Sequence, residues 1–380
     1  MSSEEKDTRF FDAFANTKAV YQEKNLKVVR YDLITRDTLL EMDKENALVL
    51  VAISPLEVHG GFLPLGTDLI EAIMMFQWIK EAIQERQPDK EFTIVEAAPL
   101  PIGWSGVRGM VGTIHVRHKT FRDVLQQYLE GFVRAGFKRF LVSSAHHGNI
   151  HAYAIEEAAL RVMKKYENFD VRIASPLNWI VKKLMIDNPR KTWGDIAEQV
   201  GQPPLTKEEY EALAKDDHSS LMEVSFMQHV NSELVDPAYK EKDLHTTPIS
   251  HMFKKLLSAK LGTLEGPTGV GYNGVPSMAD SRDWIPLYKA LIKDVGWFFI
   301  EGLFEKSHEE YMEKYATSFF YNLVMLRTNW KWRAVVVPAL IIIALLCYYP
   351  LFPWNLLSLL YIPFLLIFVG LKIKKALEPS

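Results

Sequence analysis

Three side chains of the types that bind metal ions lie close together in residues 54–68, which read SPLEVHGGFLPLGTD. They are Glu57, His59 and Asp68, and most of their neighbours are glycine, proline or leucine. Imidazole and carboxylate groups that converge in this way suit Zn²⁺, Mn²⁺ or a related divalent ion. A Glu-x-His pair on its own most often makes ordinary hydrogen bonds in a protein interior, so the interpretation needs support from other parts of the chain.

A second group of polar side chains has the same setting. His146 and His147 follow the apolar run KRFLVSSA (138–145), just as Glu57 follows the apolar run ALVLVAI (47–53). The carboxyl ends of parallel strands meet at one edge of a sheet, and open α/β proteins bind their ligands at that edge. We therefore expect the two groups to lie together and to form one metal site.

A third group lies in DDHSSLMEVS (216–225), which contains His218 and Glu223. The residues after His218 are mostly apolar and predict a buried helix or strand. A glutamate buried there without a partner would be costly. We therefore expect Glu223 to face the same site.

The elements that must position these groups alternate between short apolar runs and amphipathic helices. This alternation predicts a parallel sheet that is covered by helices on both faces. The expected strands are 47–53, 91–100, 138–145 and 170–177, and the expected helices are 37–46, 68–86, 120–137, 149–166 and one that begins near 307.

Residues 187–217 interrupt the alternation. The segment is polar, and Thr206 and Glu209 have the spacing of a capping box, which predicts the start of a short helix. It is either a lid or a contact between subunits, or else a solvated surface insertion, and the sequence favours neither interpretation.

The composition of the chain excludes some classes of protein. Its 380 residues are 48% hydrophobic and 24% charged, which is typical of globular domains. The net charge of −3 gives no basic excess, so we expect no nucleic-acid partner. Cys347 is the single cysteine, so no disulfide can form within the chain.

One region departs from this average, because residues 334–371 contain no charged side chain. A membrane helix needs roughly 20 apolar residues, and the turn formers Pro350, Pro353 and Asn355 divide this run near its middle. We predict a hairpin of two transmembrane helices that contacts membrane lipid. Basic residues flank both ends of the run, so the positive-inside rule predicts a multi-pass membrane protein whose catalytic domain faces the cytoplasm. A re-entrant hairpin and a buried hairpin in a soluble core are the alternatives.

The polar motifs resemble those of the creatininase (creatinine amidohydrolase) family. LEVHGGFLPLGTD is similar to the family signature E-x-H-G-x-x-L-P-x-G-T-D, SSAHHGN takes the place of N-G-H-G-G-N, and HSSLMEVS takes the place of H-A-G-x-x-E-T-S. Two further segments, PIGWSGVRGMVGTIHV (101–116) and GVGYNGVPSMAD (269–280), resemble the family's glycine-rich elements. The resemblance covers roughly residues 30–305, and the motifs occur in the family's order.

This resemblance implies a three-layer α/β/α fold with a mostly parallel central sheet in a catalytic domain of residues 1–330, with the hairpin and a basic tail in residues 331–380. It implies a pair of divalent ions, Zn²⁺ or Mn²⁺, and catalysis by a metal-bound hydroxide. Asp68 would bridge the two ions and His218 would transfer protons. By position, the metal ligands are Glu57, His59, Asp68, His146 and Glu223. His147 and Trp104 are candidates for substrate binding.

The chain also departs from the family pattern. Ser144 and Ala145 stand where the family has Asn and Gly, and Gly148 stands where creatininase itself has a ligand glutamate. The second ion would then depend on Glu223, on His147 or on water, and creatinine is disfavoured as the substrate.

Together these features predict a membrane-tethered, homo-oligomeric amidohydrolase that cleaves a C–N bond of a small linear or cyclic amide. One alternative is a metal hydrolase that acts on a peptide or a formamide of a pathway. The other is a catalytically silent membrane protein that keeps the fold for assembly.

Overall fold

A six-stranded sheet forms the centre of the computed structural model, which describes residues 18–185, 189–245 and 268–318. The strand order is β1-β2-β4-β3-β5-β6, and β1 alone runs antiparallel to its neighbour. The strands are β1 Val20–Glu23, β2 Leu26–Arg30, β3 Ala47–Ala52, β4 Phe92–Glu96, β5 Arg139–Ser143 and β6 Arg172–Ala174. The predicted, mostly parallel central sheet is therefore confirmed.

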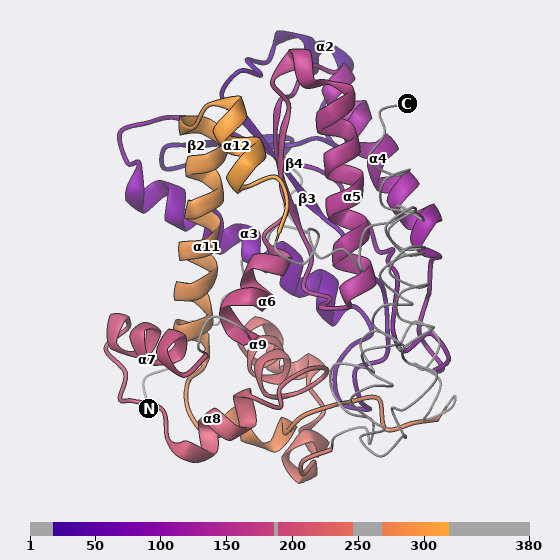
Figure 1. The fold of residues 1–380 in the computed structure, drawn as a ribbon, viewed down its shortest axis with the longest axis vertical. Helices are drawn as coiled ribbons and strands as arrows, with labels where there is room; N and C mark the ends of the chain where they lie inside the picture. Colours follow the sequence, from indigo (N-terminus) through magenta and orange to yellow (C-terminus); the bar gives the residue numbers. More distant parts are fainter. Residues whose placement is uncertain (1–17, 186–188, 246–267, 319–380) are drawn as a thin grey trace, which may run out of the picture. The chain divides into compact units, whose positions relative to one another are not determined.

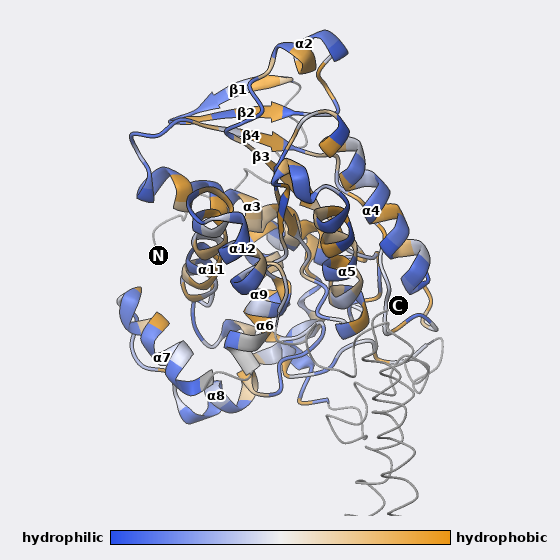
Figure 2. Ribbon diagram, turned by 45° about the horizontal axis from the view of Figure 1, so that its top comes forward, coloured by the Kyte–Doolittle hydropathy of each residue, from blue (hydrophilic) through white to orange (hydrophobic). Residues whose placement is uncertain are grey.

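Helices cover the sheet on both sides. Helices α3 (Thr67–Arg86) and α11 (Ile285–Glu305) pack against each other on one side, and α4 (His118–Arg134) and α5 (Asn149–Lys165) pack against each other on the other side (Figures 1 and 2). The shorter helices are α2 Arg36–Glu41, α6 Leu177–Met185, α7 Pro189–Gln199, α8 Lys207–Leu213, α9 Leu221–Asn231 and α12 His308–Lys314. Single 3₁₀ turns occur at Glu167–Phe169, Ser232–Leu234, Pro237–Glu241 and Pro276–Asp280.

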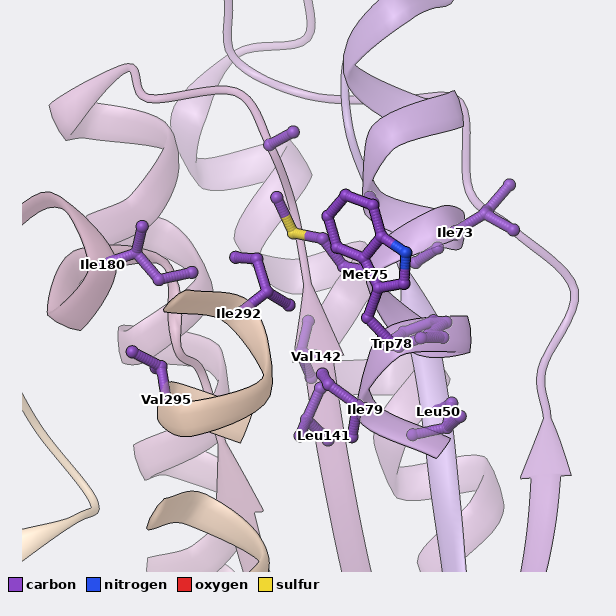
Figure 3. Packing of buried hydrophobic residues seen from close by; sticks show 14 of the residues in the cluster. Leu50, Ile73, Met75, Trp78, Ile79, Leu141, Val142, Ile180, Ile292 and Val295 are labelled. Atoms are coloured by element: carbon purple, nitrogen blue, oxygen red, sulfur yellow. The ribbon is translucent and has the colours of Figure 1, made fainter. Parts of the chain in front are cut away.

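The core lies between the sheet and these helices because the central strands are apolar on both faces. Every residue of β3 is buried, as expected of a parallel strand that is covered on two sides. On one side, Trp78 and Ile79 of α3 pack among Leu50, Leu141 and other side chains from β3, β5 and α11 (Figure 3). This packing fixes the first turn of α3 at the carboxyl edge of the sheet.

The sequence-based prediction missed one hairpin and made one strand too long. No strand was predicted before residue 47, yet β1 and β2 form a hairpin at one edge, with Lys24 at the positive φ of 52° that its tight turn requires. The last predicted strand, 170–177, is shorter, since β6 ends at Ala174 and α6 begins at Leu177. Edge strands carry polar side chains and short strands give little periodic signal, so these elements are hard to recognise.

The described part of the predicted insertion, residues 189–217, buries several of its side chains against the domain. Its capping box is confirmed, because Thr206 and Glu209 exchange side-chain to backbone hydrogen bonds at the start of α8. Trp193 and Ile196 of α7 are buried, and Arg282 forms a salt bridge with Glu209 at 2.6 Å. The segment leads the chain directly to His218.

The predicted membrane hairpin, residues 334–371, lies outside the described residues, as does the predicted domain boundary at residue 330. Among the helices that the structure does describe, none has the length and apolar character needed to span a bilayer. The described elements belong to one compact unit, Met1–Thr317.

Candidate metal centre

The stretch that follows β3 folds into a tight turn that brings its polar side chains together. The backbone N–H of Glu57 donates to the carbonyl of Leu65 at 3.0 Å, which closes the turn. Gly60 has a φ of 61°, a conformation that favours glycine, and its N–H donates to the carbonyl of Gly271. The chain then enters α3, whose first turn contains Asp68.

Three other segments complete the centre. His146 follows the carboxyl end of β5, next to β3 in the sheet. His218 lies in the segment before α9, where its backbone pairs with that of Asn273. Glu223 occupies the first turn of α9 and accepts a hydrogen bond from the backbone N–H of Ser219 at 2.6 Å. Ligand-type residues that are 166 positions apart along the chain, from Glu57 to Glu223, therefore meet at one edge of the sheet.

Asp68 lies between two sets of ligand-type side chains. Its Oδ2 atom is 3.3 Å from Nδ1 of His146, and its Oδ1 atom is 3.2 Å from Nε2 of His59. Glu57 Oε1 lies 2.9 Å from the same nitrogen of His146. Glu223 Oε2 lies 3.6 Å from Nε2 of His59. The two oxygens of one carboxylate thus face two different histidines, which is the arrangement expected of a bridging ligand.

The donor atoms of each set are close enough to surround one ion. Within each of three overlapping sets, one donor atom from every member lies within 4.8 Å of the others. Two of the sets share Asp68. The third set places His218 beside Glu57 and His59. The sets are Glu57, Asp68 and His146; His59, Asp68 and Glu223; and Glu57, His59 and His218. The second set favours Glu223 as the donor that replaces the glutamate missing at Gly148.

Burial makes the charge of this centre unusual. Burial lowers the pKa of His59, but Asp68 and Glu223 outweigh it and raise that pKa to about 10. Burial raises the pKa of Glu223 to about 8 against the opposing effect of His59, with Asp68 adding to the rise. Without a metal, the raised pKa values mean that His59 and Glu223 retain protons, which offset the negative charge of the centre.

The other ligand-type residues are also strongly coupled. Burial raises the pKa of both Asp68 and Glu57. His59 and His146 outweigh this effect at Asp68, and His146 with His218 outweighs it at Glu57, so both pKa values are lowered. Burial lowers the pKa of His146, and Glu57 and Asp68 reverse that effect and raise it well above its usual value. The carboxylates are therefore ionised while the imidazoles carry protons that an ion would displace.

Orphaned polar atoms support a metal at this position. Within the described part of the chain, Glu57 Oε2 and Asp68 Oδ2 are buried and make no hydrogen bond. Leaving buried polar atoms unpaired is costly. Carboxylate oxygens left without a hydrogen bond beside imidazole nitrogens fit Zn²⁺ or Mn²⁺.

His218 differs from the ligand-type histidines. Its Nε2 atom donates a hydrogen bond to the carbonyl of Val58 at 2.8 Å, and its Nδ1 atom lies 3.7 Å from Glu57 Oε1. Burial and the neighbouring His59 lower its pKa. The imidazole is therefore neutral near pH 7, with a free lone pair on the nitrogen that faces the centre.

The remaining predicted residues lie near the centre but outside the donor sets. His147 is half-buried and follows His146. Trp104 is buried, and its ring makes an edge contact with His115 at 5.8 Å between centroids. At Gly148, a Cβ atom would lie 2.4 Å from Nε2 of His146. A glutamate at this position would therefore require His146 to move.

Sequence reasoning missed one acidic residue of the centre. Glu71 lies one turn after Asp68 on α3 and is 3% exposed, and its Oε1 atom has no hydrogen-bond partner among the described residues. Burial, Glu223 and Asp68 hold its pKa well above its usual value. The signal was available, since a helical spacing of three residues places Glu71 on the same face as Asp68.

Comparisons with known proteins agree with this geometry. A family model described as "Creatininase: Creatinine amidohydrolase" matches residues 32–294, which is more than half of the chain. A comparison with curated proteins found no match.

Solved structures with the same fold include several creatininases. One is described as the crystal structure of creatinine amidohydrolase (creatininase), with a TM-score of 0.51 and 13% identity, covering 75% of this chain and 100% of that chain. A structure described as "Creatininase Mn" has a TM-score of 0.50, 13% identity and the same coverage, 75% and 100%. A mutant creatininase of the Zn-Zn type has a TM-score of 0.50 and 13% identity, and the match covers 75% of this chain and 100% of that chain. At this identity the likeness establishes the fold.

Proposed function

This chain belongs to the creatininase family, and from that premise we propose that it is a metal-dependent amidohydrolase that cleaves a C–N bond of a small amide. The observation that carries the proposal is the position of Asp68 between two donor sets. The descriptions of related structures name Mn and a Zn-Zn form, and the donor types here suit both metals. The family and the geometry together favour hydrolysis over a silent assembly role, because Glu57, His59, Asp68, His146 and Glu223 form donor sets that could each hold an ion.

Each side chain has a distinct part in this proposal. Glu57, Asp68 and His146 would hold one ion, and His59, Asp68 and Glu223 would hold the other. When bound, such a pair of ions supplies an activated water and polarises the carbonyl oxygen of the amide. The surrounding protein excludes bulk solvent from these donors, since Glu57, His59 and Asp68 are each 1% exposed or less.

His218 is proposed to move the proton that amide hydrolysis requires. Because its Nε2 atom donates to the Val58 carbonyl, the Nδ1 atom is the one that can accept a proton. That nitrogen faces Glu57, so it lies beside the first donor set. A proton taken there from the attacking water can then pass to the leaving nitrogen, which cannot depart as an anion.

The test combines metal analysis with turnover. The purified chain should contain about two divalent ions, measured by plasma mass spectrometry, and should release amine or ammonia from members of a panel of linear amides, cyclic amides and formamides. If the protein contains the ions but hydrolyses only formamides, the result would favour the alternative of a formamide hydrolase. Bound ions with no turnover of any amide would support the silent alternative.

We also propose that residues 334–371 anchor the protein in a membrane and that the catalytic domain forms homo-oligomers, facing the cytoplasm. The support for the anchor is the absence of charge in that run. Membrane fractionation of the full chain, alongside a chain ending near residue 330, tests the anchor. Native mass spectrometry of both proteins tests the oligomer.

A further inference from the structure

A fully buried histidine outside the donor sets connects the segments that build the centre. His151 lies in the first turn of α5, five residues after His146. Its Nδ1 atom accepts a hydrogen bond from the backbone N–H of Trp104 at 3.3 Å. Its Nε2 atom lies 3.0 Å from Oγ of Ser144, and that oxygen lies 2.8 Å from Oγ of Ser54.

These contacts define which nitrogen of His151 carries the proton. A backbone N–H can only donate, so the bond from Trp104 requires Nδ1 to be the acceptor. In the neutral ring the proton is then on Nε2, which donates toward Ser144. The result is a chain of hydrogen bonds from the glycine-rich segment, through the imidazole, to the ends of β5 and β3.

The two serines of this chain of hydrogen bonds lie shortly before predicted metal ligands. Ser54 lies three residues before Glu57, and Ser144 lies two residues before His146. Both hydroxyls are buried, and both lie where a strand of the sheet ends. The contact between the two hydroxyls therefore joins the two loops that carry these ligands.

His146 needs such support because it lacks the usual one. A histidine that binds a metal normally donates its second ring N–H to a carboxylate, a carbonyl or water, which fixes the orientation of the ring. In the described part of the chain, Nε2 of His146 has no such hydrogen bond. The ring instead packs edge-to-face against His151, with centroids 5.1 Å apart and an interplanar angle of 88°.

His151 is itself held on two sides. Phe121 of α4 stacks on the imidazole, with centroids 4.5 Å apart and an angle of 18° between the planes. On another side, Gly103 approaches so closely that a Cβ atom there would lie 2.7 Å from the ring. The ring has no space in which to turn, so it can act as a rigid support.

We propose that His151 is a positioning residue, which holds the ring of His146 and the loops after β3 and β5 in the geometry that one metal ion requires. The inference rests on the proposed function, since it gives His146 the role of a ligand. Ser144 takes part as the hydrogen-bond acceptor of His151. The segment containing Trp104 is held to the same imidazole by the hydrogen bond from its backbone N–H.

The test compares two adjacent buried serines. Ser144→Ala removes the acceptor of His151, whereas Ser143→Ala removes a hydroxyl that instead contacts Sδ of Met75 at 3.6 Å. Zn²⁺ affinity is measured for the full chain by competition with a chromogenic chelator. We expect Ser144→Ala, and likewise His151→Phe, to bind one of the ions about 10- to 100-fold more weakly, as is typical when an outer partner of a ligand is removed. Ser143→Ala should bind as the unmodified protein does.

A second measurement reports on the metal-free protein. Nitrogen NMR of the chain labelled with ¹⁵N-histidine should show the proton of His151 on Nε2. The ring signals of His146 should shift in Ser144→Ala and stay unchanged in Ser143→Ala. A proton on Nδ1 of His151, or equal effects of the two serine variants, would overturn the proposal. An intact NMR pattern in a chain that binds no Zn²⁺ or Mn²⁺ would instead refute the proposed function and leave the support of His146 in place.

Discussion

The two edges of the sheet each carry a cluster of charged side chains, and the two clusters differ in how completely their charges are paired. At the amino edge, the carboxylate of Asp170 forms salt bridges with Arg139 at 2.7 Å, with Arg172 at 2.9 Å and with His308 at 2.8 Å. Arg172 also donates to the carbonyls of Gly302 and Leu303 at the end of α11, each at 3.3 Å. Each of these charged groups is paired by the protein itself.

The carboxyl edge leaves its charged groups incompletely paired. Buried oxygens of Glu57, Asp68 and Glu71 make no hydrogen bond among the described residues, and protons on His59 and His146 balance the carboxylates. A cluster that only stabilises a fold gains most when every polar atom is satisfied. The difference between the edges therefore distinguishes a structural cluster from one prepared to bind an ion.

The sharpest contrast between the edges is expected from removing one charge at each. Asp68→Asn should lose both ions and all measurable hydrolysis, because one carboxylate serves both donor sets. Asp170→Asn should keep both ions and lower the free energy of unfolding by about 1–3 kcal/mol, since charged hydrogen bonds are lost. Plasma mass spectrometry and chemical denaturation measure the two effects. Full ion content in Asp68→Asn would contradict the bridging role.

A smaller effect is expected within the carboxyl edge, where His218 lies beside the donors. His218→Ala should keep its ions and lose hydrolysis by about 10²–10⁴-fold, as expected for a group that transfers protons. The variant is compared with the unmodified chain for ion content and for initial rates. An active His218→Ala with its ions bound would show that another group transfers the proton.

The edges should also respond to pH in opposite directions in the metal-free protein. The pKa of His59 is raised from 6.5 to about 10, so its contribution to stability is complete below pH 6.5 and is lost as the pH rises toward 10. Burial raises the pKa of Asp170, but Arg172, Arg139 and His308 lower it from 3.8 to about 2. That contribution is present above pH 3.8 and is lost as the pH falls toward 2.

Metal binding should release the protons that the histidines at the carboxyl edge hold. Binding of Zn²⁺ should release protons from His59 and His146, so its affinity should rise about tenfold per pH unit for each proton released. Calorimetry in buffers of different ionisation enthalpy counts these protons. Binding without proton release would show that the imidazoles are neutral before the metal arrives.

The smallest effect is expected at the backbone that supports Glu223. Ser219 has a φ of 49°, in the left-handed region, and its buried hydroxyl has no hydrogen-bond partner among the described residues. Ser219→Gly should raise the free energy of unfolding by about 1 kcal/mol, because the strain and the unpaired hydroxyl disappear together. Ion content should not change, since the N–H that donates to Glu223 is retained. A clear loss of stability would show that the serine side chain is needed.

The sequence predicted the parts of this molecule that depend on local patterns. Fully apolar strands followed by polar residues located Glu57, His59 and His146 at one edge, because the carboxyl ends of parallel strands must meet there. The helical spacing from Asp68 could also have identified Glu71. His151 could not be found in this way. Its partner Trp104 is distant in sequence, as is Ser54, which it reaches through Ser144, and these residues come together only through the packing of four segments.

Arg172 and Asp170 have a further, mechanical consequence. They join the amino edge of the sheet to α12, through the salt bridge of Asp170 with His308 and through Tyr311, which is fully buried with the Arg172 guanidinium 5.9 Å from its ring centre. Tension applied to the chain beyond Thr317 enters the domain through α12. The attachment of α12 therefore lies at the edge of the sheet opposite the donors.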